Sequence, residues 1–166
     1  MKTIAFVETT ASELGLSNVH KAVELGYQVI FVTESLDFYL ERSGSSGKKY
    51  VDGFHDIVLC ENTYDWMKII SCLACKNIDG LITFGDYHLE AVSKAAKHLK
   101  LPHCDVAAIV NCRDKYMVRK VLSENRITMP FFQRISSVSQ IEFRNLPYPL
   151  IVKQLAIPSE KFEFFV

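Results

Sequence analysis

The chain has 166 residues, 49% of them apolar, and its 19 basic and 19 acidic residues give a formal net charge of zero at pH 7. This length allows one ordinary domain, or one domain with part of another, and the apolar content excludes an intrinsically disordered chain. Because the longest basic run is only Lys48-Lys49, the charge pattern favours neither a nucleic-acid partner nor a strongly charged surface partner.

The N-terminus carries no export or membrane signal. Only four apolar residues, Ile4 to Val7, precede Glu8, which is too short a run for a signal-peptide core. No apolar stretch approaches the ~20 residues that span a bilayer. The five cysteines are odd in number and lie mostly in apolar segments. We therefore expect a cytoplasmic protein with free thiols and no membrane partner.

Short apolar runs alternate with helical patterns over the first hundred residues. Runs rich in β-branched residues predict strands over 3–7, 28–33, 56–60 and 80–84. Apolar residues at helical spacing predict helices over 12–25, 63–76 and 87–99. The polar stretch 37–54 contains three glycines, and we expect a long loop with one helical turn there.

This alternation predicts a parallel sheet, because fully apolar strands must be covered on both faces. We expect a Rossmann-like, doubly wound α/β domain with flanking helices over residues 1–105. Ligands of such sheets bind outside the carboxyl ends of the strands. Three segments follow predicted strands at that edge: 8–10, 33–35 and 85–88.

The pattern changes after Leu101-Pro102. We expect a connector, a helix, a strand, a short helix and a strand over 105–110, 114–125, 132–135, 137–143 and 149–153. The apolar end, Phe162 to Val166, is expected to be an exposed tail. Since so small a piece cannot bury a large core alone, we place a domain boundary near residue 105 and expect a small, incomplete α+β subdomain over 106–166.

Three motifs follow one another along the second piece. Arg113-Asp114-Lys115 opens its helix, Ile127-Thr128-Met129-Pro130 forms the next motif, and the run from Tyr148 to Lys153 forms the third. Together they resemble the entry to an ATP-grasp domain, with its Asp-Lys helix, its "xIPxP" turn and its "yPlvvKp" strand. The α/β domain before it is similar to the pre-ATP-grasp domain of amino-acid-ligase-like members of that superfamily. The order and spacing of these motifs carry the resemblance, which spans the whole chain but only the first part of an ATP-grasp domain.

The resemblance implies ATP-dependent ligation: a carboxylate is activated as an acylphosphate, and an amine displaces the phosphate. It implies ATP and Mg²⁺ as cofactors and an amino acid or another carboxylate as substrate. Lys115 and Lys153 would contact the ATP phosphates, since fixed ammonium groups can neutralise phosphate charge. A lysine in the first turn opposes the helix dipole, and a bound phosphate would offset that conflict. Arg119, one turn later, is interpreted as helix support.

The sequence departs from the family pattern after Lys153. Residues 154–162 contain no glycine, whereas ATP-grasp enzymes carry a flexible glycine-rich loop there. The adenine-binding hinge and the magnesium ligands of the family are also missing. We therefore assign no catalytic residue and no metal ligand. The expected function is the N-terminal portion of a carboxylate–amine ligase, truncated and inactive as this isolated chain.

Two other functions remain open. The chain could be a non-catalytic Rossmann-like module that binds a partner or a small ligand and has lost the catalytic half. A flavodoxin- or receiver-like domain is a weaker third option, because no phosphate loop or acidic cluster follows the first strand. Under either of the first two interpretations, the chain could form a homodimer or associate with a missing C-terminal half.

Several motifs have both a functional and a structural interpretation. Glu8-Thr9-Thr10 lies where pre-ATP-grasp domains can contact the amine substrate, although a plain loop fits equally well. Asp86 could contact substrate, but we favour a helix N-cap. Cys72 and Cys75 have CxxC spacing, yet there is no second pair and no nearby histidine. We expect two core cysteines on a helix rather than a zinc site.

Overall fold

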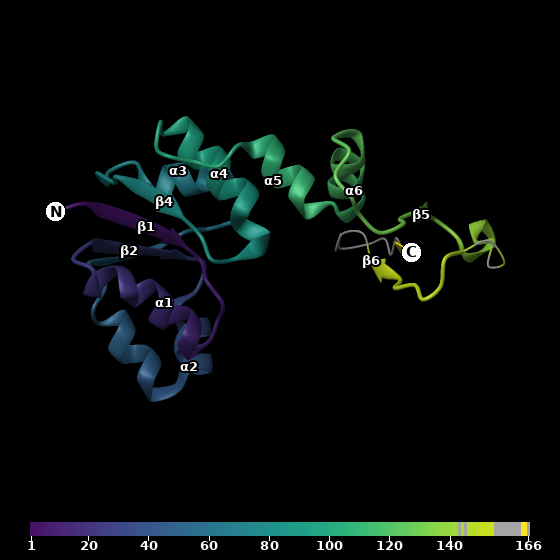
Figure 1. Cartoon of the computed structure of the whole chain (residues 1–166). Helices are drawn as coiled ribbons and strands as arrows, with labels where there is room; N and C mark the ends of the chain where they lie inside the picture. The colour runs from purple at the N-terminus through teal and green to yellow at the C-terminus, as the bar shows by residue number, and fades with distance from the viewer. Residues whose placement is uncertain (143, 145, 155–163, 166) are drawn as a thin grey trace. The chain divides into compact units, whose positions relative to one another are not determined.

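The computed structural model describes residues 1–142, 144, 146–154 and 164–165, which fall into two compact units, Met1–Val106 and Ala107–Val166 (Figure 1). The first unit is built on a four-stranded sheet of order β3-β2-β1-β4. Its strands are β1 (Thr3–Val7), β2 (Gln28–Thr33), β3 (Asp56–Leu59) and β4 (Gly80–Ile82). All three pairings are parallel, which confirms the predicted α/β sheet.

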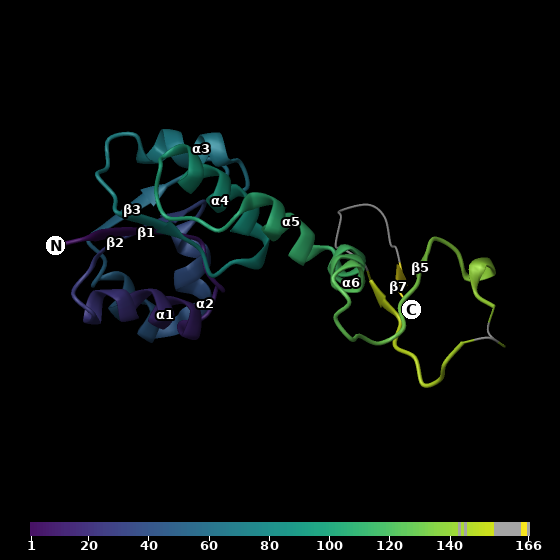
Figure 2. The same ribbon diagram turned by 45° about the horizontal axis from the view of Figure 1, so that its top comes forward.

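Helices cover both faces of this sheet (Figures 1 and 2). On one face lie α1 (Glu13–Glu24) and α2 (Leu36–Val51), and on the other α3 (Trp66–Leu73) and α4 (Leu89–His98). Side chains alternate between the faces along each strand: Phe6 and Phe31 pack with α1 and α2, whereas Ala5 and Val32 pack with α3 and α4. Two apolar cores therefore enclose the sheet, as a doubly wound fold requires.

The stretch that we predicted to be a loop is the helix α2. The helix contains a kink at Gly44, whose φ of 63° and ψ of −158° are not helical, and it continues on either side. Ser35 caps its start by accepting a hydrogen bond from the backbone N–H of Phe38. Its buried residues recur at every fourth position: Tyr39, Ser43, Gly47 and Val51. On each side of the kink the two buried residues lie four residues apart, on one face of that half of the helix, and the glycines obscured this spacing in the sequence.

Gly47 lies in tight contact with Ser43 of α2 itself, and Leu16 of α1 approaches it less closely. A Cβ atom at this position would lie 1.7 Å from Ser43 Oγ and 3.3 Å from Leu16 Cδ1. Ser43 is itself buried, and its hydroxyl donates to the Tyr39 carbonyl at 2.6 Å, so it has little freedom to move away. The glycine is thus required by packing.

The CxxC pair does not form two core positions. Cys72 lies half-buried on α3 against the core, but Cys75 is exposed beyond the end of that helix. The predicted helix is too long because Asp65 caps α3 at Trp66 and the helix ends at Leu73. Burial, and then the neighbouring Cys60, raise the pKa of the Cys72 thiol to about 12. A thiol held protonated in this way is a poor metal ligand.

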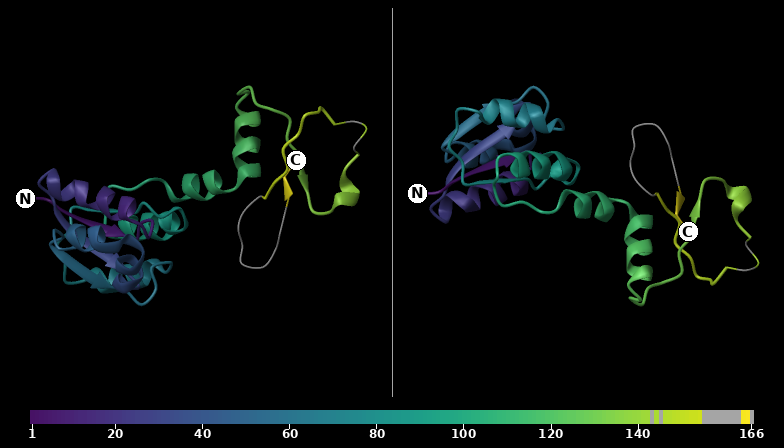
Figure 3. Two further views of the ribbon diagram at one scale, coloured as in Figure 1. Left: turned by 90° about the horizontal axis from the view of Figure 1, so that it is seen from below. Right: turned by 90° about the horizontal axis from the view of Figure 1, so that it is seen from above.

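The second unit is coloured green to yellow in Figure 3. Its helices are α5 (Val106–Arg113), α6 (Lys115–Glu124) and the short 3-10 helix η2 (Val138–Gln140). Its strands β5 (Arg134–Ile135), β6 (Lys153–Gln154) and β7 (Phe164–Phe165) form an antiparallel sheet of order β5-β7-β6. The unit therefore combines helices with a small antiparallel sheet.

Three predictions for the second unit were wrong in detail. The expected connector is the helix α5, whose Val-Ala-Ala-Ile-Val sequence is compatible with a helix. The expected strand 149–153 begins only at Lys153, and its expected first residue, Pro149, cannot donate a ladder hydrogen bond. The expected tail contributes β7, which pairs with two strands. Residues 155–163, where the sequence lacks a glycine-rich loop, lie outside the described residues.

Within the described ranges, no helix is both long and apolar enough to cross a lipid bilayer.

We predict that Gly47→Ala lowers the free energy of unfolding of the first unit by about 1–3 kcal/mol, because overpacking exceeds the gain in helix propensity. Gly80→Ala is the matched control, since a Cβ at that site meets Ile4 only at 3.9 Å. Urea unfolding followed by the fluorescence of Trp66, the one tryptophan of the chain, measures both variants. Equal stability of the two variants would contradict the packing argument.

Candidate functional site

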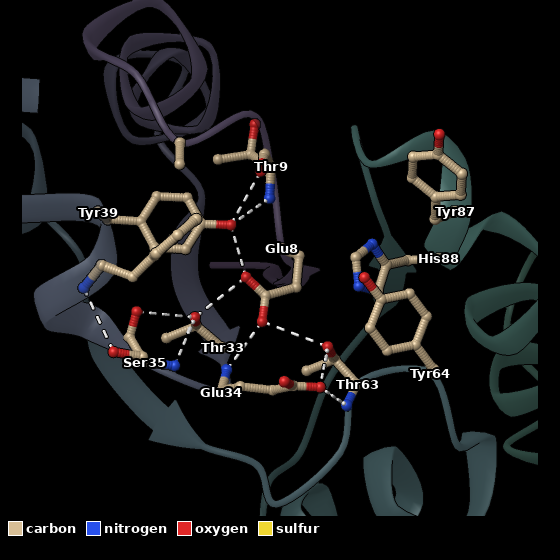
Figure 4. Close-up of a pocket in the computed structure, with 12 residues that line it drawn as sticks. Glu8, Thr9, Thr33, Glu34, Ser35, Tyr39, Thr63, Tyr64, Tyr87 and His88 are labelled. Carbon is tan, nitrogen blue, oxygen red and sulfur yellow. Dashed lines mark hydrogen bonds between the residues drawn. The ribbon is translucent and has the colours of Figure 1, made fainter. Parts of the chain in front are cut away.

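A pocket of about 620 Å³ opens at the carboxyl edge of the parallel sheet in the first unit. Its lining residues follow β1, β2, β3 and β4 in turn (Figure 4). They include members of all three segments predicted to lie at this edge: Glu8, Thr9, Thr33, Glu34, Ser35, Tyr87 and His88. The topological prediction for the edge is therefore confirmed, and the volume is within the range of small-molecule sites.

The Glu8 carboxylate lies at the centre of the pocket wall (Figure 4). Only 7% of the residue is exposed, and its backbone has a φ of 52°, in the left-handed region. One carboxylate oxygen, Oε2, accepts from the hydroxyls of Tyr39 at 2.5 Å and Thr33 at 3.0 Å. The other, Oε1, accepts from the Glu34 N–H at 2.8 Å and the Thr63 hydroxyl at 3.3 Å. Tyr39, Thr33 and the Glu34 N–H are thus neutral donors that replace the water lost by the buried carboxylate, and the single hydroxyl proton of Thr63 is shared with Glu34.

Tyr39 connects α2 to this carboxylate. Its hydroxyl accepts from the Thr9 N–H at 2.9 Å and is also within 2.8 Å of the Thr9 carbonyl. Burial, and then the hydrogen bond to Glu8, raise the pKa of Tyr39 well above its usual value. The phenol therefore remains a proton donor. The protonated Tyr39 hydroxyl stabilises the folded state fully below the ordinary tyrosine pKa of about 10. This stabilisation is lost as the pH rises through the higher pKa that Tyr39 has in the folded protein.

Glu34 supplies a second carboxylate to the pocket. Its Oε1 accepts from the N–H of Thr63 at 2.7 Å and from the Thr63 hydroxyl at 2.9 Å. Thr63 is 1% exposed and contacts both carboxylates, so it fixes their relative position. Unlike Glu8, Glu34 is exposed. Its charge therefore faces the open part of the pocket.

Aromatic rings form the opposite wall (Figure 4). The Tyr64 ring stacks on the His88 imidazole, with centroids 4.4 Å apart and an interplanar angle of 30°. Tyr64 and Tyr87 are 59% and 48% exposed, so their faces are accessible. The predicted cap is wrong: Asp86 lies in the 3-10 helix η1 (Asp86–His88), and α4 has His88 at its N-cap position without a side-chain capping bond. This turn directs Tyr87 and His88 to the pocket instead.

Both predicted phosphate-contacting lysines belong to the second unit. Lys115 is exposed and is the first residue of α6, and Lys153 is the first residue of β6, where it pairs with Phe165. The helix begins at Lys115 because the Asp114 carboxylate accepts from the N–H groups of Tyr116 and Met117. Asp114 therefore supplies the negative charge that the helix N-terminus favours, so the cation beside it needs no bound phosphate to be tolerated.

The described residues do not fit the magnesium ion that the family resemblance implies. No group of three or more histidine, cysteine, aspartate or glutamate side chains in this part of the chain could hold a metal ion. Glu8 and Glu34 each use oxygen atoms to accept hydrogen bonds from the protein. We therefore derive no chemical step through a metal.

Sequence reasoning placed Glu8 at this edge but did not identify Tyr39 and Thr63 as residues of the pocket. Thr63 carried a signal, because it follows the third strand within a few residues. The carboxyl ends of parallel strands lie at one edge of the sheet, so a hydroxyl that follows the third strand belongs to the same edge as Glu8. Tyr39 carried none, since its helix was interpreted as a loop.

Residues 19–103, just over half of the chain, match the ATP-grasp N-terminal domain. The chain therefore belongs to the ATP-grasp N-terminal domain family. No curated protein matches its sequence. The fold of its first unit is that of the pre-ATP-grasp domain of ATP-grasp ligases.

Three solved structures illustrate this likeness of fold. L-amino acid ligase from Bacillus licheniformis is 23% identical with a TM-score of 0.72, over 93% of this chain and 37% of the ligase. Phosphoribosylglycinamide synthetase from Anaerococcus prevotii is 16% identical with a TM-score of 0.66, over 99% and 44%. N5-carboxyaminoimidazole synthetase from Staphylococcus aureus, complexed with ADP, is 18% identical with a TM-score of 0.69, over 99% and 45%. This chain thus spans less than half of each.

We predict that Tyr39→Phe lowers the free energy of unfolding by about 1–3 kcal/mol, because the buried Thr9 N–H loses its acceptor and the Glu8 carboxylate loses its shortest donor. Tyr27→Phe, at a partly exposed tyrosine, is the matched control and should change stability by less than about 0.5 kcal/mol. Urea unfolding monitored through Trp66 fluorescence measures both. A Tyr39→Phe protein as stable as the control would mean that the hydroxyl does not support the buried carboxylate.

Proposed function

We propose that this chain supplies the N-terminal part of an ATP-grasp carboxylate–amine ligase. In this proposal the first unit holds a small-molecule substrate, and the second contributes lysines to the ATP phosphates. The observation that carries it is the pocket of about 620 Å³ at the carboxyl edge of a domain of the ATP-grasp N-terminal family. The position is the one where doubly wound sheets bind their ligands.

The substrate assignment follows from the chemistry of the pocket wall. Convergent polar groups from Glu8, Glu34 and Thr63 face aromatic rings of Tyr64 and Tyr87 across the pocket. Such a combination orients a small organic molecule, because the rings exclude water while the polar groups fix direction. One solved relative of this fold is an L-amino acid ligase, which supports an amino-acid-like substrate.

The phosphate assignment concerns Lys115 and Lys153. Their ammonium groups would neutralise the charge of a nucleotide. ATP, when bound, would supply the phosphoryl group that activates a substrate carboxylate. A relative of the same fold was solved with ADP, which supports a nucleotide ligand. Lys115 and Lys153 would then bind and orient phosphates, with no role in proton transfer.

We expect the chain alone to release no phosphate from ATP in the presence of magnesium and the twenty amino acids. The described residues provide no metal site, so charge on a transferring phosphoryl group would not be compensated. Phosphate release is measured colorimetrically against a heat-denatured sample. Turnover above that background, proportional to protein concentration, would show that the chain is a complete catalyst.

We expect ATP to bind the chain weakly, and each of Lys115→Gln and Lys153→Gln to weaken it by about threefold to tenfold, the usual effect of removing one charge. Lys120→Gln is the matched control because Lys120 is an exposed cation of the same helix, with its ammonium 4.0 Å from Glu124. Phosphorus NMR line broadening of ATP measures all four proteins. If the three variants lost affinity for ATP to the same extent, the attraction would be non-specific and would not depend on Lys115 and Lys153 in particular.

A further inference from the structure

We propose that Cys60 and Cys72 form a disulfide when the chain meets a low-molecular-weight disulfide such as oxidised glutathione, and that this cross-link restrains the loop that carries Thr63. The proposal goes beyond the proposed function, because it needs neither ATP nor a substrate. The juxtaposition that carries it is a pair of cysteines that face one apolar core, one from the end of β3 and one from α3, on either side of that loop.

Both cysteines belong to the apolar core on the α3 and α4 face of the sheet. Cys60 directly follows β3, and its N–H donates to the Thr33 carbonyl at 2.9 Å. Because side chains alternate along a strand, Cys60 lies on the same face as Val58. Cys72 packs against this core from α3, one position before the buried Leu73. Burial, and then the interaction with Cys60, raise the pKa of the Cys72 thiol, so the two side chains are direct neighbours.

Their different exposure gives the two thiols different roles. Cys60 is 3% exposed, and its Sγ donates to the Asn62 carbonyl at 3.5 Å. Cys72 is half-buried, and its Sγ donates to the Ile69 carbonyl of its own helix at 3.1 Å. A thiol is a weak donor, so little is lost when these bonds break. An oxidant in solution therefore meets Cys72 first, and Cys60 reacts with the sulfur that has become attached to Cys72.

The reaction is a pair of thiol–disulfide exchanges. The Cys72 thiolate attacks one sulfur of oxidised glutathione, whose S–S bond breaks, and one glutathione leaves and takes up a proton. Cys60 then gives up its proton and attacks the Cys72 sulfur, which forms the Sγ–Sγ bond and releases the second glutathione as a thiol. Two electrons pass from the two cysteines to the oxidant. Because the raised pKa of Cys72 keeps it a thiol near neutral pH, the pair responds to sustained rather than brief oxidation.

The cross-link would enclose the loop that positions the second carboxylate of the pocket. Thr63 lies between the two cysteines in the sequence, and its N–H and hydroxyl both donate to Glu34. A disulfide fixes the start of this loop to α3, which limits how far the loop can open. Oxidation is thus expected to hold the wall of the pocket in place rather than to disrupt it.

Peptide mapping of the oxidised full chain tests the cross-link. The chain is incubated with millimolar oxidised glutathione at mildly alkaline pH, and the remaining thiols are blocked with iodoacetamide. Trypsin cleaves after Lys68, so Cys60 and Cys72 fall on different peptides, 50–68 and 69–76. We expect mass spectrometry to find these two peptides joined, and dithiothreitol to separate them. Fragmentation of the joined peptides then shows which cysteine of 69–76 carries the bond.

Two variants assign the bond independently. Cys75→Ser removes the exposed cysteine that shares the 69–76 peptide, and the link should persist. Cys72→Ser removes the proposed partner of Cys60, and the link should disappear. The dispersion of the amide spectrum verifies that each variant is folded.

Amide hydrogen exchange of the unaltered chain measures the effect on the loop. We expect the backbone N–H of Thr63 to exchange at least about tenfold more slowly in the oxidised than in the reduced protein, because the cross-link opposes local opening. The N–H of Phe31, in the β1–β2 ladder, is the internal control and should exchange at the same rate in both forms.

Four results would overturn the proposal. These are a reduced Cys60 in a folded protein whose exposed cysteines carry glutathione, a bond through Cys75 in place of Cys72, a link that forms only in denaturant, or Thr63 exchange that the link leaves unchanged. The fragmentation spectrum comes from the unaltered chain, so a misfolded Cys72→Ser protein does not remove the test.

Discussion

The carboxylate of Glu8 is buried at the carboxyl edge of the sheet, where it accepts hydrogen bonds from three other segments of the chain. Tyr39 donates from α2, Thr33 and the Glu34 backbone from the end of β2, and Thr63 from the loop before α3. A buried charge without such donors would cost several kcal/mol. The left-handed backbone of Glu8 adds strain that this network must hold in place. The pocket exists because these segments meet at one group.

Much of the first unit could be predicted because its strands are short, apolar and separated by helical patterns. Strands β1 and β2 were predicted to the residue, and the edge that holds the pocket follows from topology alone. The failure at α2 has a physical cause: Gly44 marks a kink and Gly47 a close helix contact, yet both have the local character of loop residues. With that helix missing, the partner of Glu8 on α2 could not be foreseen. A hydrogen bond between a hydroxyl and a carboxylate from distant segments, such as that of Tyr39 with Glu8, leaves no periodic pattern in the sequence.

Fold and function separate clearly in this protein. The relatives of known structure include a ligase named for amino acids and a synthetase named for a phosphoribosyl compound, and both share the fold at low identity. A common scaffold therefore does not determine the ligand. In the proposed function the groups at the strand ends determine the ligand, and those that line the pocket include two carboxylates and exposed tyrosines. Lys115 and Lys153 of the second unit concern the nucleotide of the proposed function and not the ligand of this pocket.

Amide hydrogen exchange of the Glu8→Ala variant tests most directly whether the buried carboxylate organises the pocket. The account predicts faster exchange at the backbone N–H of Glu34, which loses its acceptor, and at that of Thr9, whose acceptor Tyr39 loses its anchor. Amides of the β1–β2 ladder, such as that of Phe31, should keep their protection. Unchanged exchange at Glu34 and Thr9 in a folded variant would contradict the account, because the pocket would then be held together without the carboxylate.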